Sequence, residues 1–139
     1  MVLAFAGGST TLALVTEAEL PIFDLLGREK LTAIVAGFYR RVPGDPILGP
    51  MYPPNDLAGA EQRLRSFLIY RFGGPPDYLH ERGHPRLRMR HAPFAIDHRA
   101  RDRWMELMMA SVVEQGVSEE HRAYLERFLG DIATFLQNR

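Results

Sequence analysis

The chain has 139 residues, of which 46% are hydrophobic, and its 17 basic and 17 acidic side chains leave a formal net charge of zero. This length suits one domain with a substantial core, and the balanced charge provides no chain-wide electrostatic surface for a nucleic acid. Cysteine is absent, which excludes disulfides, thiolate metal sites and cysteine nucleophiles.

Residues 1–19 are mostly apolar and small, carry no positively charged leader and are interrupted by Gly7 and Gly8. Such a segment is a poor signal peptide and is too short to span a bilayer. We therefore expect a cytoplasmic protein that binds neither membrane nor nucleic acid. Residues 1–19 are expected to be an extension of unknown role, followed by one domain over residues 20–139.

The first predicted helices follow this extension. A short helix is expected from Pro21 to Leu26, ending at Gly27. A longer one comes next, because apolar residues then recur at three- and four-residue steps: Leu31, Ile34, Val35, Phe38, Tyr39 and Val42. Tyr39 therefore points inward, and the turn-rich run PGDP at residues 43–46 ends the helix.

Tyr52 immediately precedes Pro53 and Pro54, where the chain must be extended or turning. Asn55 or Asp56 can cap a second long helix, whose buried face carries Leu57, Ala60, Leu64, Phe67, Leu68 and Phe72. The run GGPP at residues 73–76 ends this helix, and a loop with Tyr78 and His80 leads to Arg82.

The segment RGHPRLRMRHAPF, from Arg82 to Phe94, is the least ordinary stretch of the chain. Pro85 can open a short helix and Pro93 cannot continue one, so about two turns fit between them. Leu87 and His91 then share one face. His91 is well placed to offer one ring nitrogen to a metal while the other bonds a backbone carbonyl. A capping or surface role for this histidine stays open.

Two further long helices complete an all-α chain. Asp97 can cap the third, in which Trp104, Leu107, Met108, Ser111 and Val112 share a face and Gly116 marks the end. Ser118 opens the fourth, whose apolar stripe comprises Leu125, Phe128, Leu129, Ile132, Phe135 and Leu136.

Three aromatic residues with hydrogen-bond donors fall on inward faces or at a helix junction: Tyr39, Tyr52 and Trp104. Buried hydroxyl and indole groups need partners. Each donor could simply bond a backbone carbonyl within the core. Their coincidence with one proline-bounded histidine is harder to explain by core packing alone, and both interpretations stay open.

Several of these motifs resemble those of the group II truncated haemoglobins. They are Phe38-Tyr39, the run YPPNDLAGAEQRLRSFL from Tyr52 to Leu68, the GGP turn, the run YLHERGHPRLRMRHAPF from Tyr78 to Phe94, and Trp104. The resemblance extends from about residue 21 to the C-terminus. It implies a two-over-two helical sandwich that encloses haem b, with much of the proximal helix replaced by loop.

The resemblance also implies roles for individual residues. His91 would be the proximal iron ligand, opposite the distal donors Tyr39, Tyr52 and Trp104. Ala60 occupies the gate position, and its methyl group cannot coordinate iron, so the sixth position should stay free. The haem would be walled by Leu64, Phe67, Leu87, Phe94 and Met108. Its propionates would meet Arg90, Arg63 and Tyr78.

Two positions depart from the family pattern. Phe72 stands where relatives have tryptophan, which keeps an aromatic wall but removes a donor. Gly27-Arg28 stands where relatives have a pair of glycines, which leaves the packing of the first short helix open.

The expected function is reversible binding of dioxygen, carbon monoxide or nitric oxide at five-coordinate haem iron. The alternative is a redox enzyme that uses the same haem, either oxidising nitric oxide to nitrate or turning over peroxide, and it requires a reductase. A haem-free helical interaction module is a third hypothesis. A zinc site built from His80, His84 and His91 is a fourth, although it lacks a coherent carboxylate or thiolate partner.

Overall fold

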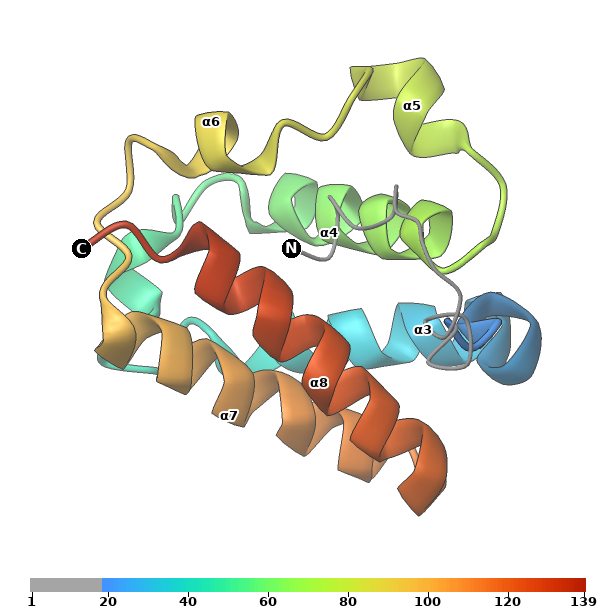
Figure 1. Cartoon of the computed structure of the whole chain (residues 1–139). Helices are drawn as coiled ribbons and strands as arrows, with labels where there is room; N and C mark the ends of the chain where they lie inside the picture. The colour runs from blue at the N-terminus through green and yellow to red at the C-terminus, as the bar shows by residue number, and fades with distance from the viewer. Residues whose placement is uncertain (1–18) are drawn as a thin grey trace.

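The computed structural model describes residues 19–139, and every regular element in that range is a helix (Figure 1). The elements in chain order are α3 (Ile22–Arg41), the 3-10 helix η1 (Gly49–Met51), α4 (Leu57–Arg71), α5 (Asp77–Arg82), α6 (Leu87–His91), α7 (His98–Glu114) and α8 (Glu119–Leu136). The predicted all-α fold class is confirmed. The predicted extension lies outside the described residues except for Glu19. Within residues 19–139, the apolar stretches of the helices fall short of what crossing a bilayer would need.

The four long helices form two stacked pairs. Helix α3 packs on both α4 and α7, and α8 packs on α7. In Figure 1 the α3–α4 pair and the α7–α8 pair enclose the centre of the molecule, while α5 and α6 lie along its upper edge. Helix α6 is a single short turn between two loops, and it contacts α8.

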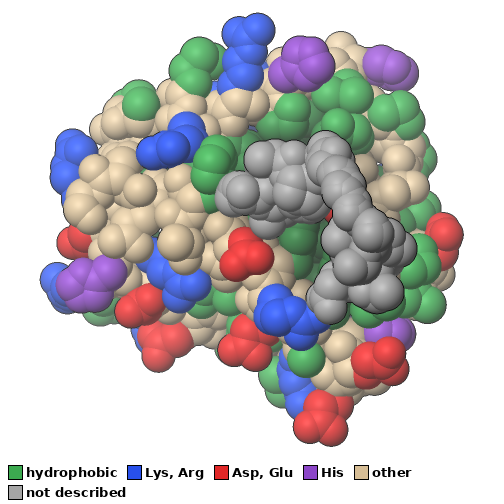
Figure 2. Space-filling model, viewed as in Figure 1, with side chains coloured by type: hydrophobic (Ala, Val, Ile, Leu, Met, Phe, Trp, Pro, Cys, Tyr) green, Lys and Arg blue, Asp and Glu red, His purple; other side chains and the backbone are tan. Residues whose placement is uncertain are grey.

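Charged side chains of both signs occupy the surface of this fold. Figure 2 shows basic and acidic side chains interspersed on one face, with hydrophobic side chains between them. This mixture follows from the equal numbers of acidic and basic residues in the chain. Scattered apolar side chains on a surface are ordinary in globular proteins, because polar groups are too few to cover it.

Helix α3 contains the break that the sequence predicts at Gly27. Gly27 has φ 85° and ψ 161°, so the short helix before it and the long helix after it meet at a kink. A positive φ of this size favours glycine because L side chains clash there. The kink lets Ile22 and Leu31, on either side of it, both enter the core.

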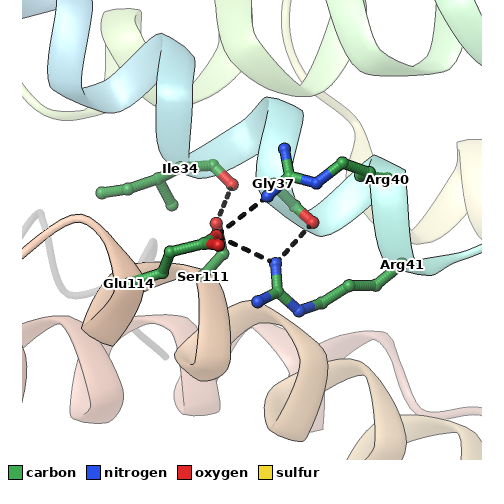
Figure 3. Close-up of polar contacts among 6 residues, drawn as sticks. All are labelled: Ile34, Gly37, Arg40, Arg41, Ser111 and Glu114. Carbon is green, nitrogen blue, oxygen red and sulfur yellow. Dashed lines mark hydrogen bonds and ion pairs between the residues drawn. The ribbon is translucent and has the colours of Figure 1, made fainter.

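Helices α3 and α7 approach closely where both carry small residues (Figure 3). The Ser111 hydroxyl donates to the Ile34 carbonyl over 2.6 Å. A Cβ atom on Gly37 would lie 2.2 Å from Ser111 Oγ, so no larger residue fits there without a shift. At the edge of the crossing, Glu114 accepts from Arg40 at 2.9 Å and from Arg41 at 3.2 Å. This crossing holds the two helices that carry Tyr39 and Trp104.

Side chains cap two of the long helices as predicted. Asp97 accepts from the Ala100 amide at 2.9 Å, and Ser118 accepts from the His121 amide at 3.3 Å. The capping prediction for α4 is wrong. Asp56 occupies the N-cap position but caps no amide with its side chain, because its carboxylate pairs with Arg63 at 2.9 Å.

Candidate functional site

A cavity of about 480 Å³ lies between the helix pairs and the loop that carries α6. Every predicted site residue except Met108 lines it: Tyr39, Tyr52, Ala60, Arg63, Leu64, Phe67, Tyr78, Leu87, Arg90, His91, Phe94 and Trp104. These residues come from α3, the loop after η1, and α4 to α7. The fold therefore brings together side chains that lie far apart in the sequence.

Met108 is the one predicted site residue that does not line the cavity, and its place in a haem wall stays a prediction. Its side chain is fully buried in the core. Met108 shares a helical face with Trp104 but lies one turn nearer to Ser111, where α7 crosses α3. The helical spacing was read correctly, but the cavity ends before Met108 because the two helices close on each other there.

His91 presents one ring nitrogen to the cavity. Its Nδ1 lies 2.7 Å from the Leu87 carbonyl oxygen. Because a carbonyl can only accept, Nδ1 carries the proton, and the lone pair of Nε2 remains available to a metal. This bond fixes both the tautomer and the ring orientation, as the contacts behind metal-binding histidines do. The prediction that one ring nitrogen bonds a nearby carbonyl is confirmed.

Helix α6 is held in place from the loop before it. Arg86, just before the helix, has φ 46°, a left-handed conformation that non-glycine residues adopt at a cost. Arg90 reaches back across this turn, donating from Nε to the Pro85 carbonyl at 2.8 Å and from Nη2 to the Arg82 carbonyl at 2.9 Å. The guanidinium group thus fastens the loop to the helix that carries His91.

Both arginines predicted to meet propionates have partners within the protein. Arg90 bonds the two loop carbonyls, and Arg63 pairs with Asp56. Each still lines the cavity, as does Tyr78, which is buried with its ring edge-on to Phe67. Their contacts with propionates stay a prediction.

Tyr39, Tyr52 and Trp104 cluster in the lining of the same cavity. The rings of Tyr39 and Tyr52 meet edge-on, with centroids 5.6 Å apart. Both Tyr39 and Trp104 hydrogen-bond to Tyr52. An indole nitrogen can only donate, so the Tyr52 oxygen accepts from Trp104.

Burial keeps both phenols protonated well above neutral pH. Burial, followed by the neighbouring Tyr52, raises the pKa of Tyr39 far above its ordinary value. Burial also raises the pKa of Tyr52 to about 12, although its hydrogen bonds with Trp104 and Tyr39 act in the opposite direction. Tyr39 and Trp104 thus hydrogen-bond to the side chain of Tyr52. This differs from the alternative in which each of the three residues bonds only a backbone carbonyl.

Asp45, which the sequence analysis passed over, supports the loop that leads to Tyr52. Its carboxylate is buried and accepts from the Ile47 amide at 3.0 Å, from the Leu48 amide at 2.8 Å and from Arg103 of α7. Burial alone would raise the pKa of Asp45, but the hydrogen bonds outweigh it and hold the pKa below its usual value. An aspartate in a proline-rich turn commonly bonds the amides two and three residues on, which was the available signal.

Helix α8 supplies a wall that the sequence analysis did not assign to the site. Leu129, Ile132, Ala133 and Leu136 line the cavity, together with Leu48, Met51, Pro53, Leu68, Arg82, Ile96, Ala100 and Arg101 from other elements. The sequence predicted the apolar stripe of α8, but such a stripe indicates only burial. It does not distinguish a packed core from a cavity wall.

The remaining histidines do not form a second site. His80, His84 and His98 are exposed and do not line the cavity. Among residues 19–139, no cluster of three or more histidine, aspartate or glutamate side chains could hold a metal ion. The zinc site built from His80, His84 and His91 is therefore wrong.

The cavity suits a large, flat, mostly apolar group that contains a metal and carries acids. It offers one imidazole nitrogen to the metal, apolar and aromatic walls, and four arginines, namely Arg63, Arg82, Arg90 and Arg101. The bacterial-like globin family model matches residues 21–138. The chain belongs to this family. Haem is therefore the implied cofactor, and the residues present fit it.

Individual relatives agree with this assignment. The chain is 38% identical to group 2 truncated hemoglobin YjbI of Bacillus subtilis over 103 residues, which cover 74% of this chain and 77% of the relative. The crystal structure of a hemoglobin from Chloroflexus aurantiacus matches with a TM-score of 0.81 and 43% identity, covering 87% of this chain and all of that one. The truncated oxygen-avid haemoglobin from Bacillus subtilis matches with a TM-score of 0.80 and 36% identity, over 85% of this chain and 98% of that one.

The expected family and architecture are thus confirmed. The chain is a group II truncated globin with the two-over-two fold. Membership in this family implies a haem cofactor and haem-based binding of small gaseous ligands such as oxygen.

Proposed function

We propose that this globin binds dioxygen reversibly, along with carbon monoxide and nitric oxide, at a five-coordinate haem b iron ligated by His91 Nε2. The observation that carries the proposal is the hydrogen bond from His91 Nδ1–H to the Leu87 carbonyl, at 2.7 Å. It leaves the lone pair of Nε2 free for a metal. When bound, ferrous haem would supply a metal that takes a diatomic ligand, and His91 would hold that metal.

Ala60 cannot itself coordinate the iron. It lines the cavity at the position that the resemblance gives to the gate residue, and its methyl group has neither a lone pair nor a hydrogen-bonding proton to offer. A diatomic ligand entering the cavity therefore has no competitor from this residue. This supports a five-coordinate resting site.

Tyr52 is the donor that we assign to the ligand. Both Tyr39 and Trp104 hydrogen-bond to it, and we assign its oxygen as the acceptor of both bonds, which leaves its own hydroxyl proton for the ligand. Hydrogen bonds accepted by a hydroxyl polarise it and strengthen the bond that it donates. Such a donor stabilises a ligand that gains negative charge on binding. Slow release follows, which suits storage better than rapid delivery.

The walls and the arginines hold the cofactor. Leu64, Phe67, Leu87 and Phe94 provide apolar contact, and Tyr78 and Arg63 reach the same cavity. Arg90 commits Nε and Nη2 to loop carbonyls, so its remaining N–H groups are the ones available to a propionate.

Replacement of His91 tests the proposal. His91→Gly should lose the proximal bond, and added imidazole should restore coordination partly. Absorption spectra of oxidised, reduced and carbon monoxide-treated protein measure this. The matched control is His84→Gly, since His84 is exposed and does not line the cavity. Unaltered iron ligation in His91→Gly would remove His91 from this role, and purified, haem-supplemented protein without a Soret band would remove the function.

Oxidation of nitric oxide and turnover of peroxide at the same site stay predictions from the sequence, as does a reductase partner. Consumption of nitric oxide in the presence of a reductase, compared with ligand binding alone, distinguishes them from simple binding.

A further inference from the structure

Asn138, which follows helix α8, is hydrogen-bonded to the segment that follows His91. Its amide nitrogen Nδ2 donates to the Phe94 carbonyl at 2.9 Å, and its Oδ1 accepts from the Ile96 amide at 2.9 Å. Its backbone amide donates to the Ile96 carbonyl at 2.9 Å. Nδ2 also lies 3.5 Å from the carbonyl oxygen of His91 itself. One residue thus engages both ends of the stretch from residue 91 to residue 96.

Helix α6 needs such support because it cannot sustain itself. It has five residues, whereas isolated helices shorter than about 12–15 residues are marginal in water. The last carbonyls of any helix also lack partners within it. Arg90 ties the N-terminal side of α6 to the preceding loop. Asn138 ties the C-terminal side to the end of α8.

We propose that Asn138 is a positioning residue for His91. By holding the backbone of residues 91–96 against the end of α8, its side-chain amide sets the position from which the His91 ring enters the cavity. The proposal rests on the proposed role of His91 as the iron ligand. It adds that the proximal geometry is set by a residue forty-seven positions away in the sequence.

Asparagine is suited to this role because its side chain both donates and accepts. An aspartate at the same position would keep the acceptor for Ile96 but lose the N–H donors to Phe94 and His91. The test therefore compares Asn138→Asp with Asn138→Ala, which loses both functions. The neighbouring Gln137 provides a matched control, since its side-chain amide bonds only the Arg139 carbonyl, at 3.4 Å, among the described residues.

Two measurements on the haem-loaded protein carry the test. The first is hydrogen exchange at the Ile96 amide, which should be about tenfold faster in Asn138→Ala, as expected for the loss of one hydrogen bond, and nearly unchanged in Asn138→Asp. The second is the iron–histidine stretching band of the ferrous protein, which reports the proximal bond directly. It should shift and broaden in both Asn138 variants and stay unchanged in Gln137→Ala.

The two readouts separate positioning from simple stabilisation. If exchange at Ile96 becomes faster while the stretching band stays the same in both variants, Asn138 only stabilises the loop and the proposal is overturned. An unchanged band together with unchanged exchange overturns it as well. Failure of the proposed function itself would give a different result, namely iron ligation that survives His91→Gly. If Asn138→Ala does not fold, the band in Asn138→Asp decides.

Discussion

The two walls of the cavity are held by different means. The wall with Tyr39, Tyr52 and Trp104 rests mainly on long helices, since α3 and α7 cross at Gly37 and Ser111 and the three polar groups bond one another. The wall with His91 rests on a five-residue helix between two loops, and side chains from Arg90 and Asn138 fasten it to its surroundings.

The ligand side is therefore stabilised collectively, whereas the iron side depends on a few separable hydrogen bonds. Packed helices share their stability over many contacts, so a single change is partly absorbed. A short helix tied by side chain-to-backbone bonds has no such reserve. Substitutions on the two walls should therefore change different properties.

The largest effect is expected on the ligand side at Tyr52. Tyr52→Phe should speed dioxygen dissociation about ten- to a hundredfold, since a hydrogen bond to a charged acceptor is worth about 1.5–3 kcal/mol. Tyr39→Phe should have a smaller effect, because Tyr39 acts through Tyr52. Stopped-flow displacement of dioxygen measures both, with Tyr70→Phe as the control, since Tyr70 stacks on Tyr78 outside the cavity. A larger effect of Tyr39→Phe would make Tyr39 the direct donor.

The loop that carries Tyr52 is tested at Asp45. Asp45→Asn should lower the free energy of unfolding by about 1–3 kcal/mol at neutral pH, since buried donors lose a charged acceptor. The pKa of Asp45 is lowered by folding, so its stabilisation is present above its ordinary pKa of about 3.9 and is lost as the pH falls through the folded value. Urea unfolding of both proteins from neutral to acid pH should show the two stabilities converging in acid.

The exposed Asp102 is the control for that experiment. Its carboxylate is 61% exposed and pairs with Arg101 at 3.2 Å. Asp102→Asn should change stability little, because exposed pairs contribute at most about 1 kcal/mol. If the free energy of unfolding of Asp45→Asn stays below that of the unmodified protein by the same amount in acid, the charge of Asp45 is not what stabilises the loop.

The smallest effect is expected on the iron side at Arg90. Arg90→Lys keeps the charge but loses the planar guanidinium group that bonds two carbonyls. A typical hydrogen bond contributes about 0.5–1.5 kcal/mol, so the amide hydrogens of residues 86–90 should exchange severalfold faster. Dioxygen dissociation should hardly change. Arg99→Lys, an exposed change at the start of α7, is the control. Unchanged exchange in Arg90→Lys would mean that only the charge of Arg90 matters, as in propionate pairing.

Local sequence was sufficient for much of this architecture. The helical periodicities, the break at Gly27 and the caps at Asp97 and Ser118 depend on neighbours within a few residues. The pairing of His91 with Leu87 also follows from helical spacing, because residues four apart share a face. The Asp56 cap failed because Arg63, two turns along the same helix, competed for its carboxylate.

Contacts between distant segments could not be predicted in this way. No spacing indicates that Tyr39 and Trp104 would both bond Tyr52, that Met108 would lie just beyond the cavity, or that Asn138 would reach the loop after His91. Each depends on how the helix pairs stack.

Local sterics and chemistry were enough to predict the four long helices, where they end and which side chains could bond a metal or a polar ligand, although residues 77–82, expected in a loop, form helix α5. Which donors bond each other and which apolar residues border a cavity became known only from the folded packing. It also decided what holds the His91 helix in place. Those outcomes depend on distances between elements, and packing sets such distances only when the whole chain has folded.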